Sequence, residues 1–131
     1  ARLVQGLPDY VNVDSTSITS INDNAEENVA SGAMYITSSD LEFMSDSAEQ
    51  IIAIRFPSVA VSGMVNKAWM LFDVDEVSWE SGQAVTIGIY GELSVNSAPI
   101  GAAARDISSR TVTNAMALWM PGATNVVHEE L

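Results

Sequence analysis

Apolar residues alternate with polar or small residues along much of the chain, which is the period expected of β-strands. The clearest run covers residues 50–56, where Ile52, Ile54 and Phe56 share one face and Pro57 ends the run. Similar runs predict strands at residues 33–37, 41–44, 66–75, 84–90 and 113–120. A helix stays the alternative for residues 113–120, and only 102–107 suits a helical turn. Many short strands favour an all-β fold, an antiparallel β-sandwich or jelly roll.

The first 21 residues differ from the rest, because short extended segments there are interrupted by Pro8. We therefore expect an extended N-terminal arm over residues 1–21 and one β-sandwich domain over residues 22–131. A chain of 131 residues suits a single such domain. The arm can pair with its own sheet, or act as a donor strand on the open edge of a neighbouring chain.

Composition and charge narrow the function classes. Apolar residues make up 47% and charged residues 17%, which argues against an intrinsically disordered chain. The net charge of −12 argues against nucleic-acid binding and against attraction to an anionic membrane surface. No apolar run approaches the roughly 20 residues of a membrane helix. The absence of cysteine excludes disulfides, thiolate nucleophiles and cysteine-ligated zinc.

Acidic residues gather at 22–28, 38–42 and 73–76. We expect the first cluster to be a loop rich in side-chain oxygens, and Ca²⁺ takes about six to eight oxygen ligands. Within each of the other two clusters, two acids lie two residues apart, so they share a strand face and repel unless solvated or bridged by a cation. The candidate calcium ligands are Asp23, Glu26, Glu27, Asp40, Glu42, Asp73 and Asp75. A solvated acidic rim is the alternative, because EF-hand spacing is missing.

Catalytic motifs are absent from the sequence. The single histidine, His128, adjoins Glu129 and Glu130, which is a poor setting for the base of a catalytic triad. Paired carboxylates could serve a glycosidase, but any acidic protein offers such pairs. Glycine-rich phosphate loops are also missing. We therefore expect a protein that is not an enzyme.

Aromatic residues offer a binding function instead. Tyr35, Tyr90 and the three tryptophans could stack on sugar rings. Trp69 and Trp119 lie in apolar strands and are expected in the core, so Trp79, in a predicted hairpin loop, and Tyr90 form the candidate sugar site. Arg55 interrupts an apolar strand, so we expect it to pair with an acidic residue, and we expect the same of Arg110.

Two features concern the cellular setting. The chain begins at Ala1 rather than Met, as a processed secreted chain does, although a trimmed fragment would look the same. Residues 14–20 are dense in hydroxyl groups that could carry O-linked sugar, with a polar strand or loop as the alternative. We expect an extracellular or cell-surface protein.

Several segments, taken in order, resemble a known family. They are residues 23–27 with Gly32, 35–42, 53–56, 68–76 and 107–110, followed by Thr113 and Trp119. Over residues 21–131 their order and spacing resemble the DNRLRE-type jelly-roll domains of extracellular proteins from marine bacteria and algae, which include carbohydrate-binding modules. Such domains usually continue beyond the point that corresponds to Leu131. The resemblance implies a sandwich truncated at its C-terminal end, which a strand from a neighbouring chain could complete.

The sequence thus predicts a non-catalytic, extracellular structural protein. Its copies would form a filament or surface assembly by β-strand exchange, and Ca²⁺ would stabilise the assembly. The alternative is a carbohydrate-binding module, with Trp79, Tyr90 and the acidic loop as the sugar site. The expected partners are further copies of the chain and a polysaccharide, with no nucleic acid and no membrane insertion.

Overall fold

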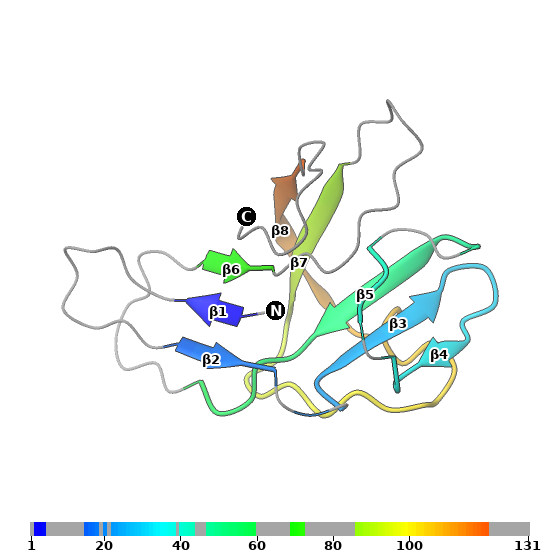
Figure 1. The fold of residues 1–131 in the computed structure, drawn as a ribbon, viewed down its shortest axis with the longest axis horizontal. Helices are drawn as coiled ribbons and strands as arrows, with labels where there is room; N and C mark the ends of the chain where they lie inside the picture. The colour runs from blue at the N-terminus through cyan, green and yellow to red at the C-terminus, as the bar shows by residue number, and fades with distance from the viewer. Residues whose placement is uncertain are drawn as a thin grey trace, which may run out of the picture.

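The computed structural model describes residues 2–4, 15–18, 20, 22–38, 40–43, 47–59, 69–72 and 86–120. This part of the chain consists of strands and loops and contains no helix, so the described fold is all-β (Figure 1). The strands are β1 (Arg2–Val4), β2 (Ser15–Ser17), β3 (Asn24–Asn28), β4 (Met34–Tyr35), β5 (Gln50–Ile54), β6 (Trp69–Leu71), β7 (Ile87–Glu92) and β8 (Val112–Trp119).

The eight strands form three antiparallel sheets, in the orders β2-β1-β6, β4-β3-β5 and β7-β8. In the first sheet β1 is the central strand, with Leu3 opposite Thr16 on one side and Met70 on the other. The N-terminal arm therefore pairs with strands of its own chain, which is one of the two arrangements expected for it.

The alternating runs predicted several strands correctly. Residues 50–54 form β5, and residues 113–119 lie in β8 rather than in a helix. The runs at 33–37, 66–75 and 84–90 contain β4, β6 and the first half of β7. The expectation for 41–44 was wrong in its described part, since Leu41, Glu42 and Phe43 lie in irregular backbone. Residues 104–109 form turns, and the Ser109 N–H donates to Arg105 O as in one helical turn, close to the helical turn expected at 102–107.

The expectation that residues 22–28 form a loop was wrong for most of the segment, because Asn24–Asn28 is strand β3. Asn and Glu are poor strand formers, but β3 is paired on both sides, with β4 and β5. Since side chains alternate along a strand, Ala25 and Glu27 face one side of the sheet and Glu26 and Asn28 face the other.

The described core is small and divided. Ala25, Ile100 and Ile107 are buried together, and Met34, Ile36 and Ala53 pack around them. Trp119 stacks on buried Phe72 with ring centroids 4.9 Å apart, and Phe43 meets both rings edge-on. The structure therefore places Trp119 against other aromatic rings, as expected of a core residue. No helix in the described ranges has the length and apolar character needed to cross a bilayer.

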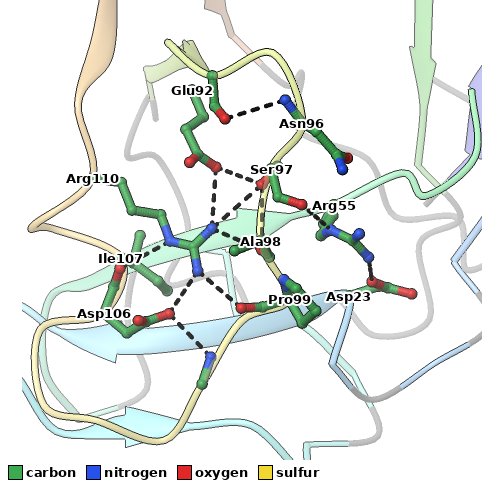
Figure 2. Close-up of polar contacts among 12 residues, drawn as sticks. Asp23, Arg55, Glu92, Asn96, Ser97, Ala98, Pro99, Asp106, Ile107 and Arg110 are labelled. Carbon is green, nitrogen blue, oxygen red and sulfur yellow. Dashed lines mark hydrogen bonds and ion pairs between the residues drawn. The ribbon is translucent and has the colours of Figure 1, made fainter.

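Both predicted arginine ion pairs are present (Figure 2). Arg55 Nη1 lies 2.6 Å from Asp23 Oδ1, and Arg55 Nε donates to Ser97 O. Arg110 Nη1 lies 3.1 Å from Glu92 Oε2, and its Nη2 lies 2.8 Å from Asp106 Oδ2. Arg55, directly after β5, thus contacts the loop after β7, and Arg110 connects that loop to the turns before β8.

The carboxylates around Arg110 are held in their charged form. The pKa of Glu92 is lowered by the hydrogen bond from Ser97 and then by Arg110, against the opposing effect of burial. The pKa of Asp106 is lowered by the backbone N–H of Gly101 and then by Arg110, again against burial. The network is therefore structural, because each of its charges is matched by a partner.

Candidate ligand-binding cleft

A cleft of about 550 Å³ lies against the sheet of β3, β4 and β5. Its lining includes polar side chains from all three strands, because Glu26 is opposite Tyr35 and Asn28 is opposite Gln50 in the strand registers. Residues of the segments after β4 and before β5 complete it. The lining residues used below are Glu26, Asn28, Tyr35, Thr37, Glu42 and Gln50.

Glu26 is the most deeply placed charged residue of this cleft, with 4% of its surface exposed. Its Oε1 accepts the backbone N–H of Glu42 at 2.6 Å, which connects β3 to the segment that carries Glu42. A hydrogen bond to an ionised acceptor is short and strong, so this contact holds the Glu26 side chain in place.

Gln50 provides an oxygen without a partner. Its Oε1 is buried and accepts no hydrogen bond, whereas the amide oxygen of Asn28 across the strand pair accepts the backbone N–H of Ser31. An unpaired buried acceptor costs about 1–3 kcal/mol relative to a paired one. A donor on a water or ligand in the cleft would remove that cost.

Glu27 lies on the opposite face of the sheet from the cleft. Its exposed fraction is 0%, and its Oε2 accepts the backbone N–H groups of Ile107 at 3.0 Å and Ser108 at 2.8 Å. Its Oε1 is buried without a partner. Glu27 thus attaches β3 to the turns before β8 through a buried, charge-assisted contact.

The predicted calcium ligands that the structure describes have different surroundings. Asp23 is paired with Arg55, Glu27 is buried on the core face, and only Glu26 and Glu42 line one cleft. Asp40 Oδ1 accepts a hydrogen bond from Ser38 Oγ at 3.3 Å. Asp73 and Asp75 lie outside the described residues.

The described ranges contain no group of three or more Asp, Glu, His or Cys side chains placed to hold a metal ion. The calcium assignment stays a prediction, and two of its seven residues, Asp73 and Asp75, lie outside the described ranges.

Of the two aromatic residues predicted to bind sugar, the structure describes one. Tyr90 on β7 is 51% exposed, on the same face as exposed Met116 and Leu118 of β8. Trp79 lies outside the described residues. Tyr35, another aromatic residue that could stack on a sugar ring, is 50% exposed and lines the cleft.

Sequence reasoning missed Asn28, Thr37 and Gln50 as cleft residues. Gln50 begins the apolar strand 50–56 and lies on the same face as Ile52 and Ile54. A polar residue on an otherwise apolar strand face was the signal that could have identified it. Asn28 and Thr37 gave no comparable signal, because both lie among other polar residues.

Neither a protein-family model, nor a curated protein, nor a solved structure matches this chain. The resemblance to DNRLRE-type jelly-roll domains, which depends on short segments, therefore stays a prediction.

Proposed function

We propose that the chain is a non-catalytic, extracellular structural subunit whose copies assemble by exchanging their N-terminal arms. The observation that carries the proposal is the place of β1 in its sheet. Residues 2–4 form the central strand and pair with β6, nearly seventy positions along the chain. A short strand that pairs with a strand distant in the sequence can be supplied equally well by an identical neighbour.

Exposed apolar side chains add support to self-association. Leu93, Val95, Leu118 and Met120 all have more than half of their surface exposed, while the described core is small. Burial of such side chains between copies would be favourable. In the proposed assembly the sheets pack as an antiparallel β-sandwich of jelly-roll type, with one strand taken from the neighbour.

Calcium would stabilise the assembly by reducing the repulsion between its acidic copies. Each copy carries a net charge of −12, so assembly brings like charges together and is opposed by their repulsion. Divalent cations held by acidic side chains reduce that repulsion, and oxygen ligands suit Ca²⁺. Of the predicted ligands, Asp40, Glu42, Asp73 and Asp75 are the proposed ones, because Asp23 is paired with Arg55 and Glu26 and Glu27 are buried.

The test is the size of the purified chain, measured by light scattering and negative-stain electron microscopy with Ca²⁺ and with a chelator. We expect large particles or fibres in Ca²⁺ that shrink when the chelator is added. A synthetic peptide of residues 1–21 in excess should cap the growing ends, whereas a scrambled peptide of the same composition should have no effect. Particles of monomer size under both conditions would refute the proposal.

The face around Tyr90 favours carbohydrate binding as a second candidate function. Tyr90, Met116 and Leu118 are exposed on one side of a two-stranded sheet, and residues 86–91 and 112–120 contain no charged side chain. A flat aromatic and apolar surface suits the apolar face of a sugar ring. Sedimentation with insoluble polysaccharides should decrease for Tyr90→Ala and stay unchanged for Tyr35→Ala, and an absence of binding to every polysaccharide would remove this candidate.

A further inference from the structure

The sheet of β7 and β8 carries two exposed methionine side chains. Met116 is opposite Tyr90 in the strand register, and Met120 directly follows the end of β8. Their exposed fractions are 51% and 71%. The thioether sulfur of such a side chain is within reach of small oxidants in solution.

The other two methionines in the described part of the chain are less exposed. Met34 in β4 packs against the buried cluster of Ala25, Ile100 and Ile107, and Met70 in β6 is also partly buried. Oxidation of a side-chain sulfur follows its exposure. The fold therefore separates these four methionines into an exposed pair and a shielded pair.

The exposed pair belongs to an apolar surface without charge. Residues 86–91 and 112–120 contain no charged side chain, and Leu118, between the two methionines, is 61% exposed. A Cβ on Gly88 would lie 3.2 Å from Tyr90 Cε2 and 3.8 Å from Met116 Sδ, so the aromatic ring and the sulfur both lie close to this glycine. A polar group added to the sulfur is therefore added to a surface that is otherwise apolar.

We propose that Met116 and Met120 form an oxidation site that changes this surface from apolar to polar. Hydrogen peroxide transfers one oxygen atom to the thioether sulfur, which is oxidised by two electrons, while the peroxide is reduced to water. Methionine sulfoxide is polar, and methionine sulfoxide reductases reverse the step with electrons from a dithiol. The strand pairing is kept, because the ladder of β7 and β8 is formed by the backbone.

The oxidation step does not depend on the proposed function, whereas its effect on assembly rests on the proposed self-association. Where copies bury this surface against one another, each sulfoxide has to lose its water at the interface, which is unfavourable unless a donor replaces that water. We expect oxidation to weaken association by about tenfold, which corresponds to about 1.4 kcal/mol.

The test is oxidation of the full-length chain by dilute hydrogen peroxide, followed by peptide mapping with tandem mass spectrometry. Met116 and Met120 should gain oxygen at least about fivefold faster than Met34, with the added mass on the sulfur rather than on Trp119. Retention on a hydrophobic-interaction column should fall as the two sulfoxides form. It should return after treatment with the reductases and a dithiol, and the circular dichroism spectrum should stay unchanged throughout.

Variants show which sulfurs are responsible. The double variant Met116→Leu with Met120→Leu keeps the surface apolar and cannot be oxidised there, so peroxide should leave its retention unchanged. Met34→Leu is the matched control and should respond to peroxide as the wild type does. Oxidation of Met34 as fast as that of the exposed pair, or an equal loss of retention in the double variant, would overturn the proposal.

Light scattering in Ca²⁺ compares the assembly of the oxidised and unoxidised chains. Smaller particles after oxidation, restored by the reductases, would support the effect on assembly, and particles of equal size would overturn it. An unoxidised chain that forms no particles would refute the proposed self-association, while the oxidation rates and the column retention would still decide whether this oxidation site exists.

Discussion

Replacing Arg110 by alanine should destabilise the fold more than the same replacement at any other described arginine. The Arg110 guanidinium makes six hydrogen bonds, including those to Glu92 and Asp106 and to the carbonyl oxygens of Ala98 and Pro99 (Figure 2). Alanine leaves two carboxylates, three carbonyl oxygens and the Ser97 hydroxyl without this donor. The network is therefore the largest single contribution that holds the loop after β7.

The magnitude follows from how far the partners are exposed. Breaking a fully buried ion pair costs about 3–5 kcal/mol, whereas exposed pairs contribute about 0–1 kcal/mol. The side chains of Arg110, Glu92 and Asp106 are 16%, 28% and 27% exposed, which lies between these limits. We expect Arg110→Ala to lower the free energy of unfolding by about 2–4 kcal/mol. Arg110→Lys should recover less than about half of the loss, because one ammonium cannot replace the planar guanidinium.

The assay is urea unfolding at pH 7, followed by tryptophan fluorescence and by circular dichroism. Arg105→Ala is the matched control, since it removes the same charge from an exposed side chain whose guanidinium makes one hydrogen bond, to Ala30 O. The control should lose about 0.5–1 kcal/mol. An equal loss in the two variants would refute the reasoning.

Acid adds a second readout of the same prediction. The pKa values of Glu92 and Asp106 are lowered in the fold from their ordinary values of 4.5 and 3.8. The stability they contribute is therefore complete above those ordinary values and is lost as the pH falls through the lower folded values. The difference between wild type and Arg110→Ala should narrow over this acidic range. It should not vanish at once, because Ser97 and Gly101 also lower these pKa values.

Two further predictions concern β3 and its turn. Glu27→Ala should lower the free energy of unfolding by about 3–5 kcal/mol in urea melts, because it leaves the N–H groups of Ile107 and Ser108 without an acceptor. Glu27→Gln keeps an oxygen as acceptor and should lower it by about 1–3 kcal/mol. A loss in Glu27→Ala no larger than that of exposed Glu49→Ala would contradict this. Gly32→Ala should lower the thermal midpoint, because Gly32 has a φ of +74° and an added Cβ would overlap Arg105 Cγ. We expect Gly32→Ala to lower the free energy of unfolding by about 1–3 kcal/mol. The control Gly101→Ala should lower it by less than about 0.5 kcal/mol, because its Cβ would meet no atom closer than 3.9 Å. Equal melting of the two variants would show that the turn at Gly32 is not constrained.

The sequence predicted the parts of the fold that depend on local alternation. β5 and β8 lie in runs that the sequence predicted as strands, and the cations Arg55 and Arg110 were expected to find acidic partners. These inferences need only the residue and its neighbours, since a charge within an apolar segment is costly unless it is paired. Which acid forms the pair was not predictable, because Asp23 is 32 residues from Arg55.

The sequence was misleading where long-range contacts override local preference. β3 carries Asn and Glu, which favour loops, but Glu26 and Glu27 accept hydrogen bonds from backbone donors 16 and 80 residues away. Nothing in a short window shows such donors. The same limit explains the cleft, where only two of the predicted acidic ligands come together and where Gln50, an ordinary strand residue by pattern, provides the unpaired oxygen.

The contact of Glu27 with Ile107 and Ser108 has a consequence for the order of folding. A carboxylate is expensive to dehydrate alone, so the core face of β3 stays hydrated until the segment 80 positions later has been synthesised and has delivered its two N–H groups. Closing so long a loop is slow relative to forming local hairpins. On the ribosome, the first half of this domain should therefore emerge without its native interior, exposed to chaperones and proteases until the second half arrives.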